Sequence, residues 1–329
     1  MTVSYKHPSV RLVGRWDTTN EKYAEATTTG AYVEFAFEGK MALAHFDTEG
    51  NREPCVHLWI QLDGGDMIES AIDSYIRVIA KDEGKHVCRI IFKSAPENDR
   101  RWYRPLHAKV SFCGFQAKKP VEIGADTRKT VEFVGDSITE GVLIDVDYCE
   151  GGEREYYWED HNRPFEDDAC ATYAWLTSEA LDLRPIIMGY GSVGASRIGN
   201  GKVPAAPDAY PYNFDGSPIT HKADYVIINH GANDRRKSAE EFIPAYRKLL
   251  EAVRRHQPDA KIIALTPFCG AHHEAIGELV KKYNAEAGDD VIFVDSFGWI
   301  PADPLHPLRD GHEAVAKNLI PILDRIING

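Results

Sequence analysis

The chain has 329 residues, of which 43% are hydrophobic and 10% are aromatic, and this composition is typical of a globular protein with a full core. Its formal net charge of −13 argues against nucleic acid and anionic membranes as partners, because both require a basic surface. No apolar run approaches the length of a membrane span, and the N-terminal residues lack the apolar core of a signal peptide, so we expect a cytoplasmic protein. Six scattered cysteines without CxxC spacing predict free thiols and no zinc site.

The first third of the chain has the pattern of short β-strands separated by turns. Large apolar residues alternate with small or charged ones over 33–37, and Glu-Gly-Lys at 38–40 predicts a turn into the next strand. A second alternation over 56–62 stops at Asp-Gly-Gly at 63–65, which is a strong hairpin signal. We therefore predict an all-β domain, a jelly roll or sandwich, over residues 1–118.

Residues 119–129 are polar, and we interpret them as the linker to a second domain that covers 130–329. In that domain strand and helix patterns alternate, which indicates a parallel sheet covered by helices. The expected strands are 131–134, 185–190, 225–229, 261–265 and 291–294. The sequence thus predicts an α/β domain preceded by an all-β domain.

The clearest helix is expected from about 238 to 256, where Ser238 and Glu241 have the spacing of a capping box. Pro244 is awkward inside this stretch, so we expect the regular helix to begin only near that residue. The last helix is expected to follow Asp310.

The segment 145–168 interrupts the alternation and is both acidic and aromatic. Because it follows the first strand of the α/β domain closely, we expect it at the rim of the carboxyl edge of the sheet. Its aromatic residues, Trp158 among them, fit two roles there, stacking on a sugar ring or packing between the subunits of a homo-oligomer. The alternative is a solvated insertion.

A Gly-Asp-Ser tripeptide ends the strand at 131–134 and places Ser137 at the carboxyl end of a strand, where open α/β sheets have their sites. The backbone N–H of this serine lies near the start of a helix-compatible stretch, where partial positive charge stabilises an oxyanion. Serine is a weak nucleophile by itself, so this role requires a histidine elsewhere. We interpret Asp136 as the residue that stabilises the turn.

Asp303 and His306 lie between the last strand and the last helix and could supply the base. On a tight Asp-x-x-His loop the carboxylate can accept a hydrogen bond from one ring nitrogen, which aims the other nitrogen at the serine. The alternative makes Asp303 a turn residue and His306 a surface histidine.

Two further strand ends offer donors for an oxyanion. Asn233 follows the strand at 225–229 and has a side-chain amide that can donate. Gly194 follows the strand at 185–190 and can present its backbone N–H without steric hindrance, with Gly191 as the alternative.

Two neighbouring side chains are weaker candidates for contact with substrate. His230 is close to Asn233 and is more simply a packed residue at the end of its strand. Trp299 precedes Asp303 closely and either walls an acyl pocket or packs in the core. No metal site is expected, because the His-His-Glu run at 272–274 lacks a histidine at the spacing of a zinc-protease helix.

Taken in order, the blocks around Ser137, Gly194, Asn233 and His306 resemble the four blocks of the SGNH (GDSL-type) hydrolases. The resemblance implies a flavodoxin-like three-layer fold over the later part of the chain. It implies Ser137 as the nucleophile, His306 as the base and Asp303 as the residue that orients the base. The oxyanion donors implied are the Ser137 N–H, the Gly194 N–H and the Asn233 side chain, and no cofactor is needed.

The all-β domain narrows this resemblance. A jelly-roll domain opened by Gly-Arg-Trp at 14–16 and joined to a Gly-Asp-Ser-Ile-Thr block is similar to carbohydrate esterase family 2. That similarity implies a serine esterase that removes O-acetyl groups from xylan- or mannan-type oligosaccharides. Some members of that family work with a Ser-His dyad, whereas Asp303 is present here to complete a triad.

Two other functions stay open on the sequence alone. One is a short-chain lipid or thioester acyl hydrolase on the same fold. The other is a non-catalytic carbohydrate-binding protein with a degenerate hydrolase domain, against which the intact Ser137, Asn233, Asp303 and His306 argue.

Overall fold

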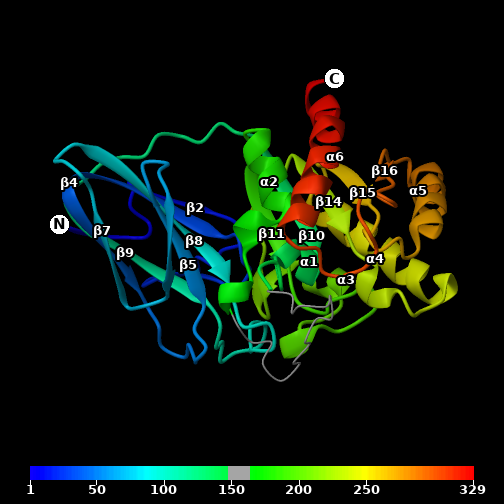
Figure 1. Ribbon diagram of the computed structural model, residues 1–329, viewed down its shortest axis with the longest axis horizontal. Helices are drawn as coiled ribbons and strands as arrows, with labels where there is room; N and C mark the ends of the chain where they lie inside the picture. Colours follow the sequence, from blue (N-terminus) through cyan, green and yellow to red (C-terminus); the bar gives the residue numbers. More distant parts are fainter. Residues whose placement is uncertain (147–163) are drawn as a thin grey trace.

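The computed structural model describes residues 1–146 and 164–329, which form a β-rich N-terminal part and an α/β part side by side (Figure 1). The β-rich part is a nine-stranded sheet in which every strand pairing is antiparallel. Its strands are β1 (Thr2–Ser4), β2 (Val10–Val13), β3 (Ala24–Ala26), β4 (Tyr32–Phe46), β5 (His57–Leu62), β6 (Met67–Ala71), β7 (Tyr75–Ile79), β8 (Lys85–Ser94) and β9 (Val110–Pro120).

Strand β4 is continuous through Gly39, so the turn expected at 38–40 is wrong. Gly39 has a φ of 124°, a conformation that glycine adopts readily, and the strand bends there without ending. Before the bend β4 pairs with β2 and β8, after it β4 pairs with β7, and β9 pairs with β4 on both sides of the bend. The hairpin expected at 63–65 is confirmed, because β5 and β6 pair on either side of it.

The α/β part contains a five-stranded parallel sheet in the order β11-β10-β14-β15-β16, which is the strand order 2-1-3-4-5 of flavodoxin-like folds. Each expected strand is present, with ends that differ from the prediction by at most one residue. The strands are β10 (Thr130–Gly135), β11 (Arg184–Gly189), β14 (Tyr225–Asn229), β15 (Lys261–Leu265) and β16 (Ile292–Val294), and a small hairpin is formed by β12 (Tyr212–Phe214) and β13 (Ser217–Pro218).

Helices cover both faces of this sheet and make three layers (Figure 1). Buried side chains of α2 and α6 pack on one face, and those of α3, α4 and α5 pack on the other. The α-helices are α1 (Ser137–Glu140), α2 (Tyr173–Ala180), α3 (Ala206–Ala209), α4 (Ala239–His256), α5 (His273–Ala287) and α6 (Arg309–Asn328). Short 3-10 turns are η1 (Pro164–Glu166), η2 (Ala169–Ala171), η3 (Asn200–Lys202) and η4 (Ala232–Asp234).

Helix α4 begins at Ala239, so the expected late start near Pro244 is wrong. The predicted capping box is present, because Ser238 accepts from the Glu241 N–H and the Glu241 side chain accepts from the Ser238 N–H. This cap and the buried Phe242 fix the first turn before the proline is reached, and the helix continues through it.

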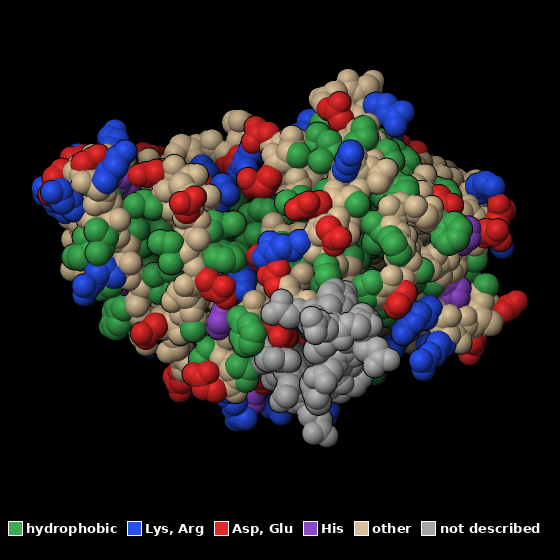
Figure 2. Space-filling model, in the orientation of Figure 1, with side chains coloured by type: hydrophobic (Ala, Val, Ile, Leu, Met, Phe, Trp, Pro, Cys, Tyr) green, Lys and Arg blue, Asp and Glu red, His purple; other side chains and the backbone are tan. Residues whose placement is uncertain are grey.

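The surface and the cysteines agree with the composition. Lys and Arg side chains alternate with Asp and Glu over the face in Figure 2, without a large area of one sign. Within residues 1–146 and 164–329, no helix has the length and apolar character that crossing a membrane requires. The expected free thiols are found at Cys55, Cys88, Cys113, Cys170 and Cys269, and Cys149 lies outside the described residues.

Candidate active site

Ser137 is presented by a tight turn between β10 and α1. Asp136 is the N-cap of α1, and its carboxylate accepts a hydrogen bond from the Ile138 N–H at 3.0 Å. Gly135 is required at the end of the strand, because a Cβ atom there would lie 2.0 Å from Thr139 Oγ1. The turn therefore places the serine at the carboxyl end of a central strand.

His306 reaches this serine from the loop between β16 and α6. The distance between Ser137 Oγ and His306 Nε2 is 2.8 Å, which is a hydrogen bond. The serine is only 4% exposed. A buried hydroxyl bonded to an imidazole nitrogen is the arrangement that a serine nucleophile and its general base require.

Asp303 lies on the same loop but is exposed. Across the described ranges, the structure gives its carboxylate no hydrogen bond or ion pair to His306. The role of Asp303 in orienting the ring therefore stays a prediction.

Asn233 lies in η4 and its amide is close to the serine turn. The amide nitrogen donates to Asp136 Oδ2 at 3.2 Å and to the Val193 carbonyl oxygen at 3.0 Å. Burial raises the pKa of Asp136 to about 7, and the charges of Asp234 and Glu140 add to this rise. The link between Asp136 and Asn233 was not expected, since the sequence suggested only a turn-stabilising role for Asp136.

Gly194 lies in the loop after β11, which is hydrogen-bonded to the loop after β14 through Asp234. Its backbone N–H donates to the Arg197 carbonyl oxygen at 3.0 Å, and a Cβ atom on it would lie 2.4 Å from Asp234 Oδ2. Asp234 also accepts from the Ala195 N–H at 2.8 Å. The choice between Gly194 and Gly191 as an oxyanion donor stays a prediction.

The weaker candidates have different surroundings. His230 is 1% exposed, neither ring nitrogen has a hydrogen-bond partner among the described residues, and burial lowers its pKa to about 4. Trp299 is half-buried and packs against the core beneath α2 and α6. Trp158 lies outside the described residues, as does most of the expected insertion at 145–168.

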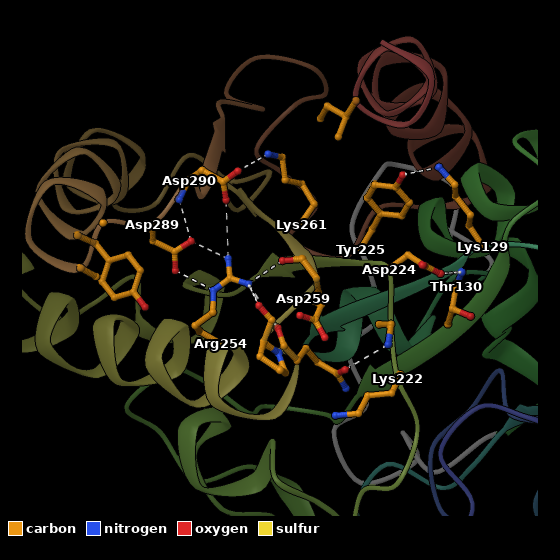
Figure 3. A pocket seen from close by; sticks show the side chains of 18 of the residues that line it. Lys129, Thr130, Lys222, Asp224, Tyr225, Arg254, Asp259, Lys261, Asp289 and Asp290 are labelled. Atoms are coloured by element: carbon orange, nitrogen blue, oxygen red, sulfur yellow. Dashed lines mark hydrogen bonds and ion pairs between the residues drawn. The ribbon is translucent and has the colours of Figure 1, made fainter.

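A cavity of about 1070 Å³ lies at the opposite edge of the sheet (Figure 3). Its lining includes Thr130, Tyr225 and Lys261, which begin strands β10, β14 and β15. Several of its charges are already paired, for example Arg254 with Asp289. This cavity is therefore remote from the carboxyl ends of the strands, where Ser137 lies.

The model of the GDSL-like lipase/acylhydrolase family matches residues 133–314, which is more than half of the chain. The chain belongs to this family. The match begins in β10, just before Ser137, and ends in α6, just after His306.

The described residues contain no group of three or more His, Cys, Asp and Glu side chains that could hold a metal ion.

Curated relatives of this GDSL-like protein include two esterases. Cellulase/esterase CelE of Acetivibrio thermocellus is 25% identical over 95% of this chain and 39% of its own length. An acetylxylan esterase / glucomannan deacetylase of Cellvibrio japonicus is 24% identical over 61% of this chain and 58% of its own length. The chain thus spans less than two thirds of each of these relatives.

Solved structures extend the likeness to the whole fold. A family two carbohydrate esterase from Cellvibrio japonicus superposes with a TM-score of 0.80 at 19% identity, over 100% of this chain and 98% of that one. The similarity therefore includes the β-rich part as well as the hydrolase part.

Proposed function

We propose that this protein is a serine esterase that removes O-acetyl groups from carbohydrates. The observation that carries the proposal is the hydrogen bond of 2.8 Å between Ser137 Oγ and His306 Nε2 at the carboxyl edge of the sheet. Membership of an acylhydrolase family and the activities named for the two relatives point to an ester as the substrate.

In the proposed reaction, His306 accepts the hydroxyl proton as Ser137 Oγ attacks the acetyl carbonyl carbon. The negative charge that develops on the carbonyl oxygen is stabilised by the Ser137 N–H. In this proposal the Asn233 amide and the Gly194 N–H add to it by exchanging their hydrogen bonds to the carbonyl oxygens of Val193 and Arg197 for bonds to the oxyanion. The tetrahedral intermediate collapses, and the sugar alcohol leaves with the proton from His306. Water, activated by His306, then attacks the acetyl-enzyme and releases acetate.

Within this proposal Asp303 orients His306, and the support is its position three residues before the histidine on one loop. Burial lowers the pKa of His312, in α6, to about 3, and the charges of His306 and Arg309 add to this fall. His312 is therefore neutral and leaves His306 as the proton acceptor.

The proposed substrates are acetylated xylan- or mannan-type oligosaccharides. The support is the name of the Cellvibrio relative and the net charge of −13, which suits a neutral substrate.

We also propose that the β-rich part is a jelly roll. The support is that the long strand β4 pairs with both β8 and β9, and that Phe35 of β4 stacks on Phe115 of β9 at a centroid distance of 4.6 Å. The cytoplasmic location and a homo-oligomer stay predictions.

Chain-length preference on p-nitrophenyl esters tests the acyl group directly. We expect kcat/KM to fall steeply from acetate to butyrate and longer esters. A preference for octanoate would instead identify a lipid or thioester hydrolase, and the absence of any hydrolysis would favour a carbohydrate-binding protein.

A further inference from the structure

The loop between β8 and β9 belongs to the β-rich part and packs against the turn that carries Ser137. Arg101, in this segment, is 1% exposed and forms an ion pair and hydrogen bond with Glu140. Glu140 is 2% exposed and is the last residue of α1, the short helix that begins at Ser137. A cation of the β-rich part thus neutralises a buried carboxylate on the helix that presents the serine.

The same helix is held by the β-rich part at a second point. Thr29 Oγ1 donates to the Glu140 carbonyl oxygen at 3.0 Å. Gly189, at the end of β11, packs so closely on α1 that a Cβ atom there would lie 2.6 Å from the Glu140 backbone nitrogen. Glu140 is therefore constrained from both parts of the molecule.

The loop after β11 is held by the same segment. The Arg101 guanidinium lies 5.2 Å from the centre of the Tyr190 ring, and Trp102 meets that ring edge-on at 5.9 Å. Thr27 Oγ1 is 2.8 Å from the Tyr190 hydroxyl oxygen. One arginine therefore contacts both the helix that begins at Ser137 and the loop that follows β11.

Arg101 is a cation close to a group of buried or half-buried carboxyl groups. Burial raises the pKa of Glu140, Glu97 and Asp167, and the charge of Arg101 opposes this rise in each of them. Without Arg101, Glu140 would be left as a buried carboxylate without its counter-ion, an arrangement that is strongly destabilising in proteins.

We propose that Arg101 is a positioning residue, which sets the place of Ser137 relative to His306 through its ion pair with Glu140. The proposal rests on Ser137 being the nucleophile of the function proposed above. It makes the β-rich part a component of the active site, because that part fixes the helix on which the nucleophile lies. A displacement of about 1 Å at a reacting group is enough to lower a rate by about 100-fold.

The test compares Arg101→Met, Arg101→Lys and the double variant Arg101→Met/Glu140→Gln with the wild type on p-nitrophenyl acetate. Arg101→Met leaves the buried Glu140 carboxylate without its counter-ion and so destabilises the fold. The double variant removes that buried charge. We expect kcat of the double variant to fall by about 10- to 100-fold with KM changed less than threefold. Arg101→Lys retains the charge and should recover most of the lost kcat.

The matched control is a second buried ion pair between the same two parts. Arg15 and Glu132 lie 2.7 Å apart with both side chains 0% exposed, and Glu132 is in β10, away from the serine turn. Arg15→Met/Glu132→Gln should lower the unfolding temperature but leave kcat within about threefold of the wild type. All rates are compared at a temperature at which circular dichroism shows each variant folded.

Two results would overturn the inference: wild-type kcat in a folded Arg101→Met/Glu140→Gln variant, or an equal loss of kcat in the Arg15 control. The proposed function fails in a different way, namely if Ser137→Ala hydrolyses the ester as fast as the wild type. An inactive Ser137→Ala variant beside a fully active Arg101 double variant would reject the positioning role alone.

Discussion

Ser137 is almost fully buried, yet its hydroxyl oxygen is within hydrogen-bond distance of an imidazole nitrogen. In such a site water is largely excluded, and fixed donors act on a developing charge more strongly than they would in solution. The donors around this serine therefore deserve separate tests, residue by residue.

Asn233→Ala tests the side-chain donor of the proposed oxyanion site. Removing one such donor costs about 2.7–4 kcal/mol of transition-state stabilisation, which corresponds to a loss of about 10²–10³ in kcat. Steady-state kinetics on p-nitrophenyl acetate give the number. A kcat close to that of the wild type would remove Asn233 from the mechanism and leave it as a residue that only hydrogen-bonds Asp136 and Val193.

Asp303→Asn tests the orienting carboxylate. If Asp303 fixes the His306 tautomer during turnover, Asp303→Asn should lower kcat by at least about tenfold. The same change in a serine-protease triad lowers kcat by about 10⁴-fold. The pH dependence of kcat/KM should shift in the same variant, because the basicity of the histidine depends on its partner. An unchanged kcat and pH profile would show that Ser137 and His306 act without this carboxylate.

At the scale of elements, the strands of the parallel sheet could be predicted within one residue because they are short buried runs, apolar in their interior except for Glu132 in β10. Strand β4 could not, since a glycine with positive φ fits both a turn and a bend. Its continuation is decided by pairing with β8 and β9, which lie far along the chain. The early start of α4 likewise has a reason that the proline conceals. The capping box and the buried face of the helix stabilise the first turn more than Pro244 destabilises it.

The N-cap of α1 gives the fold a dependence on pH. Burial raises the pKa of Asp136 from 3.8 to about 7, so between these values the folded protein keeps a proton that the unfolded chain has released. The contribution of Asp136 to stability is thus present at pH 4 and is lost as the pH rises towards 7. Asp136→Asn should therefore weaken the fall in unfolding temperature between pH 5 and pH 7.5.

Asp136→Asn removes the titrating carboxyl group but keeps the helix cap, because asparagine Oδ1 can still accept from the Ile138 N–H. Thermal unfolding of the two proteins across this pH range, followed by circular dichroism, gives the comparison. Parallel curves for wild type and Asp136→Asn would mean that the carboxyl group has the same pKa in both states of the chain.

At the scale of the whole molecule, the two parts could be recognised in the sequence, but not the way in which they interlock. The buried Arg15–Glu132 pair joins residues 117 positions apart, and the Arg101–Glu140 pair joins residues 39 positions apart. Neither pair has a local pattern, because each charge is accommodated only when the other part is folded against it. The candidate catalytic blocks are recognisable because each one follows a strand. Arg15 lies in the Gly-Arg-Trp motif and Glu140 follows the Gly-Asp-Ser-Ile-Thr block, but neither motif shows which residue is the partner of the buried charge.

The most direct test of the proposed function is acetate release from acetylated xylo-, manno- and cello-oligosaccharides, measured with the wild type and Ser137→Ala. We expect the wild type to release acetate from at least one of these substrates, and Ser137→Ala to be slower by at least about 10³-fold while unfolding at the same temperature. The proposal would be contradicted if the wild type released no acetate from any substrate, or if Ser137→Ala released it at the wild-type rate.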